Sequence, residues 1–337
     1  MTIPQPAIPL GSTVVVIGAN GFMGVETCEK LLTAGFSVRG TVRNVDKHRN
    51  WMHSLFDEKW PGRFSLVRVV DFEEQGAFDE AFRVIFDTDP DKAIDPVIKG
   101  LRNTLEAAAR AGVQRYVLSS SSKAVESCVY NHPHIIQTDT FNYEAVRKVK
   151  ENSTGSGFER ALSVYSAGRT LAELEFWSWV KQNKPPFVAN CVVPDGNFGR
   201  ILGPDTEGSS VGMLKSAFSG EWKNVIPHLG YYIDVQDSAR LLVAALSLSS
   251  LENERIFAYR YQGTWNDLRR RVRELYPDRS DVITGDDLEI EGMDLSDATG
   301  PIQRAEKVLR EVGQQGFTSE DDMLRDFVAS VYGDGDS

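Results

Sequence analysis

The chain has 337 residues, of which 41% are hydrophobic and 25% are charged, and its formal net charge is −11. This length suits one large α/β domain with an appended lobe, or two modest domains. The acidic charge argues against nucleic acid as a partner, because phosphate backbones favour basic surfaces. No apolar run reaches the length of a membrane span, and we expect no signal peptide at the N-terminus. The three cysteines lack C-x-x-C spacing, which predicts reduced thiols and a cytoplasmic protein.

The first pattern along the chain is VVVIGANGFMG at 14–24, an apolar stretch rich in β-branched residues that runs directly into three glycines. Apolar side chains then recur with helical spacing over 22–34, and a second strand pattern follows at 36–43. A strand, a glycine turn and a helix N-terminus together form a pyrophosphate site. The first glycine permits the turn, the second admits the phosphates, and the third lets helix and strand pack closely. The residues predicted to bind the dinucleotide here are Gly18, Asn20, Gly21, Phe22, Met23 and Gly24.

Strand and helix patterns alternate through the first half of the chain. Further strands are predicted at 64–72, 115–120 and 187–193, and helices at 91–112 and 161–182. This alternation is typical of an α/β fold with a Rossmann-like, doubly wound parallel sheet. The polar stretch between 126 and 158 contains ENSTGSG and reads as a loop, in which His132 and His134 lack the partners of a metal site.

The alternation loosens after residue 193, which predicts two parts. We expect a dinucleotide-binding domain over 1–193, with 234–248 packing back on it, and a smaller C-terminal substrate-binding lobe over 194–332. Residues 333–337 form a polar tail that we expect to be disordered. Within the lobe, the patterns predict a strand at 255–261 and helices near 236–248, 264–276, 301–312 and 319–332.

The second informative pattern is VYSAGRTLAELEFW at 164–177. Tyr165 and Arg169 are four positions apart, so they share one face of the predicted helix. Upstream, the strand at 115–120 runs into LSSSS (118–122), which places hydroxyl groups at the carboxyl edge of the sheet, where α/β folds bind ligands.

Together these segments resemble the extended short-chain dehydrogenase/reductase family, and more narrowly fungal aldehyde and ketone reductases and plant dihydroflavonol reductases. The shared pieces span nearly the whole chain and include GANGFMG, VRGTVR, YVLSSSS, YSAGRTLAE and YYIDVQDSARL. The resemblance implies that Ser121 hydrogen-bonds a substrate carbonyl while Tyr165 donates a proton and a nicotinamide delivers hydride. Ser119, Ser120 and Ser122 leave the register of the catalytic serine open by one residue. A tyrosine phenol acts more readily beside a cation, which the family supplies as lysine and this chain as Arg169.

Basic residues near the end of the second strand indicate the cofactor. An acidic residue there would hold the ribose 2′-hydroxyl of NAD, whereas this chain has Arg39, Arg43 and Lys47, which favour the 2′-phosphate of NADP(H). Asp71 would lie near the adenine by resemblance, and Pro194, Tyr165 and Arg169 would complete the cofactor site. The predicted substrate pocket is mostly apolar and suits a small hydrophobic carbonyl compound; its residues are Ser122, Asn197, Phe198, Met213, Trp222, His228 and Tyr231.

The sequence departs from the family at a second place. Between 77–83 and 84–91 the family carries a further apolar strand, which is missing here. Either FRVIF (82–86) is a shortened replacement, or the edge of the first strand is covered in another way, or the sequence reflects an altered gene model. An open edge inside a parallel sheet would leave backbone groups unpaired.

These observations predict an NADPH-dependent reductase of an aldehyde or ketone, working on a tailoring step of secondary metabolism as a monomer or homodimer. Two other functions stay open. One is a non-redox isomerase, dehydratase or cyclase that uses Tyr165 as acid and base, which Arg169 and the missing strand favour. The other is a catalytically silent dinucleotide-sensing module, against which Tyr165 and the serine run argue.

Overall fold

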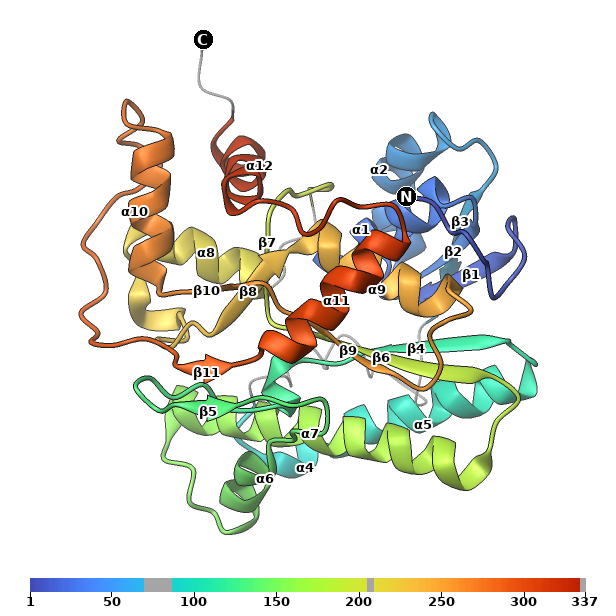
Figure 1. Cartoon of the computed structure of the whole chain (residues 1–337), viewed down its shortest axis with the longest axis horizontal. Helices are drawn as coiled ribbons and strands as arrows, with labels where there is room; N and C mark the ends of the chain where they lie inside the picture. The colour runs from blue at the N-terminus through green and yellow to red at the C-terminus, as the bar shows by residue number, and fades with distance from the viewer. Residues whose placement is uncertain (70–86, 205–208, 334–337) are drawn as a thin grey trace.

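The computed structural model describes residues 1–69, 87–204 and 209–333 (Figure 1). Two groups of three parallel strands form its centre. In the first, β1 (Thr13–Ile17) pairs with β2 (Ser37–Val42), which pairs with β3 (Phe64–Arg68). In the second, the order is β4 (Arg115–Ser119), β6 (Val188–Pro194) and β9 (Arg255–Ala258).

Strand β6 shows why helices cover both faces of its sheet. Its side chains alternate between two cores, because successive residues of a strand point to opposite faces. Ala189, Cys191 and Val193 pack with α5 (Asp95–Arg110) and α7 (Gly157–Asn183). Val192 packs on the other face with α9 (Val235–Ser247) and α11 (Thr299–Glu311), so that helices lie on both sides of this sheet in Figure 1. The doubly wound arrangement expected from the alternating pattern is confirmed.

A smaller lobe carries its own core. The helices α8 (Ser209–Ser219), α10 (Trp265–Leu275) and α12 (Glu320–Tyr332) gather at the left of Figure 1. They share one apolar cluster around Phe218 and Phe327. Beside them lies a short sheet in the order β10 (Tyr261–Gln262), β8 (Tyr231–Asp234) and β7 (Gly196–Phe198). The remaining described elements are α2 (Val45–Asp57), α4 (Pro90–Ala93), the 3-10 helix η1 (Ser122–Ala124), β5 (His134–Ile135), α6 (Tyr143–Lys150), the 3-10 helix η2 (Trp222–Asn224) and β11 (Ser296–Asp297).

The structure changes the expected assignment of two C-terminal segments. The strand expected in the lobe at 255–261 ends early as β9, and it pairs with β6 in the central sheet. Helix α11 likewise packs against β9 and α9 in the first core, with Val308 and Leu309 fully buried. A single division at residue 193 therefore does not describe the packing, because the chain returns to the first core after building the lobe. The expected loop over 126–158 also contains helix α6, whose N-cap Asn142 accepts a hydrogen bond from the Ala145 backbone.

The missing family strand would have lain beside β1. Within the described residues, β1 pairs only with β2 and β4 pairs only with β6, so the two sheets are separate. Val15 and Ile17 of β1 are exposed on one face. Residues 70–86, on which the alternatives for completing the sheet depend, lie outside the described residues, as does the tail at 334–337.

The turn between β1 and α1 (Phe22–Thr33) makes a prediction about stability. Gly18 has φ +69°, a left-handed conformation that costs a residue with a Cβ about 1–2 kcal/mol. Gly18→Ala is therefore expected to lower the free energy of unfolding by about that amount in a urea titration without nucleotide. Gly100→Ala is the matched control, since Gly100 lies inside α5 with open space around its Cβ position. We expect this control to be neutral or stabilising, and equal destabilisation by both changes would contradict the conformational argument.

Candidate active site

The turn after β1 has the geometry of an anion cradle. The backbone N–H of Gly21 donates to the carbonyl of Gly18 at 3.0 Å, which closes the turn. A Cβ at Gly24 would lie 2.2 Å from that same carbonyl oxygen, so α1 approaches the turn as closely as a glycine permits. The first turn of α1 has no side-chain cap and no acidic residue, so its backbone N–H groups are available to bind an anion.

The glycine turn, the end of β4 and helix α7 meet at one place. The Ser119 hydroxyl lies 3.7 Å from the Met23 sulfur, which joins the end of β4 to the start of α1. The Arg169 guanidinium on α7 donates from Nη2 to the Ser119 carbonyl at 2.8 Å. Its Nε is buried and has no hydrogen-bond partner among the described residues. An unpaired buried donor is costly, so this position suits a ligand that brings an acceptor.

The surroundings of the four serines separate their roles. Ser120 donates to Glu173 Oε2 on α7 at 2.6 Å, and Ser122 donates to Asp195 Oδ1 after β6 at 2.6 Å. Both serines are buried, and burial also raises the pKa of the Asp195 carboxyl. Ser121 is half-buried and accepts from the Lys123 backbone N–H, and it donates no hydrogen bond among those described. Of the four, Ser121 is the serine whose hydroxyl proton is available to a substrate oxygen.

Tyr165 lies one helical turn before Arg169 on the same face of α7 and is half-buried. Helix α7 packs against η1, where the Thr170 hydroxyl lies 3.5 Å from the Lys123 carbonyl. Helix α7, which carries Tyr165 and Arg169, is therefore in contact with the short helix that Ser121 caps.

The basic residues predicted to bind the cofactor lie at different positions along and after β2. Arg43 follows the last residue of β2, and Lys47 lies in the first turn of α2, whose N-cap Asn44 accepts from the Lys47 backbone at 3.1 Å. Arg43 is partly buried, which lowers the pKa of its guanidinium, although arginine stays charged in proteins. Arg39 instead pairs with Val15 in the middle of the sheet, about 10 Å before the strand end. Pro194 ends β6, and Asp71 lies outside the described residues.

Several residues expected to line the substrate pocket are core residues in the structure. Phe198 and Tyr231 are only 2% and 4% exposed, and the Tyr231 hydroxyl donates to the Ser296 carbonyl at 2.8 Å. The Asn197 amide is also buried, accepting from Ser238 and donating to the Asp195 carbonyl at 2.9 Å. These three expectations do not fit the packing, because the side chains are already enclosed by protein.

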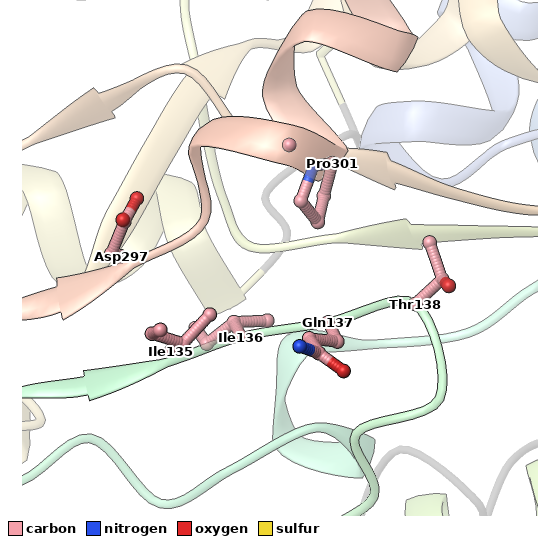
Figure 2. A pocket seen from close by; sticks show the side chains of 7 residues that line it. Ile135, Ile136, Gln137, Thr138, Asp297 and Pro301 are labelled. Carbon is pink, nitrogen blue, oxygen red and sulfur yellow. The ribbon is translucent and has the colours of Figure 1, made fainter.

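Of the other expected substrate residues, Ser122 is buried, whereas Met213, Trp222 and His228 are partly exposed. Met213 and Trp222 pack on the edge of the lobe core, a cluster against which Met23 also packs. The His228 ring lies 4.5 Å from that of Tyr130, which the sequence did not single out. His134, which the sequence analysis did not assign to a metal site, pairs with Glu126. Figure 2 shows a separate open pocket of about 390 Å³, lined by residues 135–138 and by Asp297, Gly300 and Pro301, and none of the predicted site residues belongs to it.

These features define an enzyme class that binds a nicotinamide dinucleotide on a Rossmann fold, with a serine, a tyrosine and a cation at the carboxyl edge of the sheet. Comparison with known proteins agrees. A family model described as "NAD(P)H-binding" matches residues 18–154. "Aldehyde reductase 2" of Sporidiobolus salmonicolor is 33% identical over 97% of this chain and 98% of its own. "Ketoreductase adrE" of Penicillium roqueforti is 31% identical over 92% and 94%.

Among solved structures, yeast methylglyoxal/isovaleraldehyde reductase Gre2, complexed with NADPH, has a TM-score of 0.71 at 20% identity and covers 95% of this chain and 98% of its own. The chain belongs to the extended short-chain dehydrogenase/reductase family, and the resemblance drawn from its motifs is confirmed. No helix within the described residues is long and apolar enough to cross a membrane.

Proposed function

We propose that the protein is an NADPH-dependent reductase that converts an aldehyde or ketone to an alcohol. The observation that carries the proposal is that Met23 and Arg169 both contact Ser119. Through these contacts, the start of α1, the serine run and the helix that bears Tyr165 lie close together. The two relatives, an aldehyde reductase and a ketoreductase, support the same reaction.

The residues present fit the dinucleotide. The uncapped start of α1 and the close approach at Gly24 make room for a pyrophosphate, and the unpartnered Nε of Arg169 suits an acceptor such as a ribose hydroxyl. Arg43 and Lys47 would bind the 2′-phosphate, which favours NADPH over NADH. When bound, NADPH supplies the hydride that reduces the carbonyl carbon.

Residues of the chain itself bind and protonate the carbonyl oxygen. Ser121 donates its hydroxyl proton in a hydrogen bond to that oxygen, and Tyr165 transfers a proton to it as negative charge develops. The permanent positive charge of Arg169 favours the phenolate that Tyr165 becomes after this transfer. Met213 and Trp222 are partly exposed apolar side chains at the edge of the lobe core, which suits a small hydrophobic substrate. The free cysteines fit a cytoplasmic enzyme.

A non-redox reaction is the second candidate, and the specific observation that favours it is Arg169. The planar guanidinium can hold a carboxylate or an enolate through two donors, which a lysine ammonium cannot do in the same geometry. Its Nη2 already donates to the Ser119 carbonyl, however, and its buried Nε has no hydrogen-bond partner among the described residues. Because one nitrogen already has a protein acceptor, less of the guanidinium is left for a bidentate anion, which favours the reductase.

The preference for NADPH makes a prediction about Arg43. Arg43→Ala is expected to weaken NADPH binding by about 1.5–3 kcal/mol, the range for hydrogen bonds to charged groups, with little change for NADH. Fluorescence titration with each nucleotide measures both affinities. Arg39→Ala is the matched control, because Arg39 lies on the same strand but in its middle, and it should leave both affinities unchanged. Equal weakening of NADPH and NADH by Arg43→Ala would show that Arg43 has only a structural role.

Proton transfer makes a prediction about Tyr165. Tyr165→Phe removes only the phenolic oxygen and its proton, so turnover should fall by about 10²- to 10⁴-fold, the usual contribution of a general acid. The dissociation constant for NADPH and the melting temperature should stay close to those of the wild type. Steady-state kinetics with a small panel of aromatic ketones measure the loss of turnover. A variant that keeps most of its turnover would remove Tyr165 from the mechanism.

A further inference from the structure

Three residues of α7 lie on one face at successive turns: Tyr165, Arg169 and Glu173. Two of them bind the end of β4. Arg169 donates to the Ser119 carbonyl at 2.8 Å, and Glu173 accepts from the Ser120 hydroxyl at 2.6 Å. Consecutive turns of the helix are thus tied to consecutive residues of the strand, and this sets both the rotation and the axial position of α7 relative to Ser121.

Glu173 is the centre of this connection and is completely buried. Besides Ser120, it accepts from Arg255 Nε at 2.5 Å and Nη2 at 3.2 Å, and from Trp177 Nε1 at 3.3 Å. Arg255 is the first residue of β9 and is itself almost completely buried. A buried ion pair of this kind adds little net stability, because the cost of removing two charges from water offsets their attraction. Its consequence is geometric, since every donor fixes the carboxylate in one orientation.

Arg255 extends the connection to the segment on the other side of Ser121. Its Nη1 donates to the carbonyls of Thr138 and Thr140 at 3.0 and 2.6 Å, and its guanidinium lies 4.1 Å from the centre of the Phe141 ring. The next residue, Asn142, donates from its backbone to the Ala124 carbonyl at 2.9 Å and from its side chain to the Lys123 carbonyl at 3.1 Å. The network therefore closes on η1, the short helix that Ser121 caps.

We propose that Glu173 is a positioning residue that, through Ser120 and Arg255, holds Tyr165 and Ser121 at the separation from which both address one carbonyl oxygen. The inference rests on the proposed function, and it adds residues that touch neither substrate nor cofactor. Small displacements of reacting groups lower reaction rates by large factors. Loosening this network should therefore lower kcat even where the melting temperature changes little.

Ser120→Ala is the sharpest test, because it removes the hydroxyl that joins β4 to Glu173 and leaves the ion pair with Arg255 intact. We expect kcat for NADPH-dependent reduction to fall about tenfold to a hundredfold, with the NADPH dissociation constant unchanged. Ser120→Thr, which restores a hydroxyl, should recover activity. Ser247→Ala is the matched control: Ser247 is equally buried, but its hydroxyl donates within α9 to the Val243 carbonyl, and its loss should leave kcat unchanged at a similar change in melting temperature.

A crystal structure of Ser120→Ala supplies a readout that does not depend on turnover. The proposal requires a changed separation between the Tyr165 and Ser121 hydroxyls relative to the wild type. An unchanged separation, or a kcat equal to that of Ser247→Ala, would overturn the positioning role. Failure of the proposed function would look different, since the wild-type enzyme itself would then reduce no carbonyl compound with NADPH.

Discussion

The attachment of α7 to the carboxyl end of β4 is the contact on which the rest of the site depends. The helix carries Tyr165 and Arg169, the strand carries the serines, and neither element alone forms a reactive centre. Hydrogen bonds from Arg169 to the Ser119 carbonyl and from Ser120 to Glu173 join them at adjacent residues. The bond between Ser120 and Glu173 is buried, so water does not compete for it, whereas the bond from Arg169 to Ser119 lies at an exposed strand end.

The dinucleotide cradle is joined to the same strand end. Met23 follows the glycine turn and lies against Ser119, while Phe22 and Met23 also pack with the core of the C-terminal lobe. A second connection links α1 to the lobe, where Arg200 donates through two nitrogens to the fully buried Glu26 at 2.6 and 2.9 Å. Helix α1 thus contacts both the end of β4 and the C-terminal lobe, which suits a reaction between two bound molecules.

The sequence predicts those parts of the site that depend on local pattern. The strand, glycine turn and helix over residues 14–34 are adjacent in the chain, and their periodicity and glycine spacing are enough to place them. The helix bearing Tyr165 and Arg169 is predicted for the same reason. Its observed bounds, 157–183, are a few residues wider than expected.

Features that depend on distant partners could not be predicted in this way. The register of the four serines is set by Glu173 and Asp195, which lie more than fifty residues away in the chain. Phe198 and Tyr231 are aromatic residues of the kind that lines apolar pockets, yet tertiary packing encloses them in the core. The return of β9 to the central sheet is likewise a long-range pairing, since a short apolar run carries no signal for the sheet that it joins.

The most direct test of carbonyl reduction is the stoichiometry of cofactor use. Purified protein is incubated with NADPH and a panel of aromatic aldehydes and ketones, while NADPH absorbance and product are followed in the same sample. A reductase consumes one NADPH for each alcohol formed and forms no product when NADPH is left out. Conversion of a substrate without consumption of NADPH would contradict the account and would identify a non-redox enzyme on the same fold.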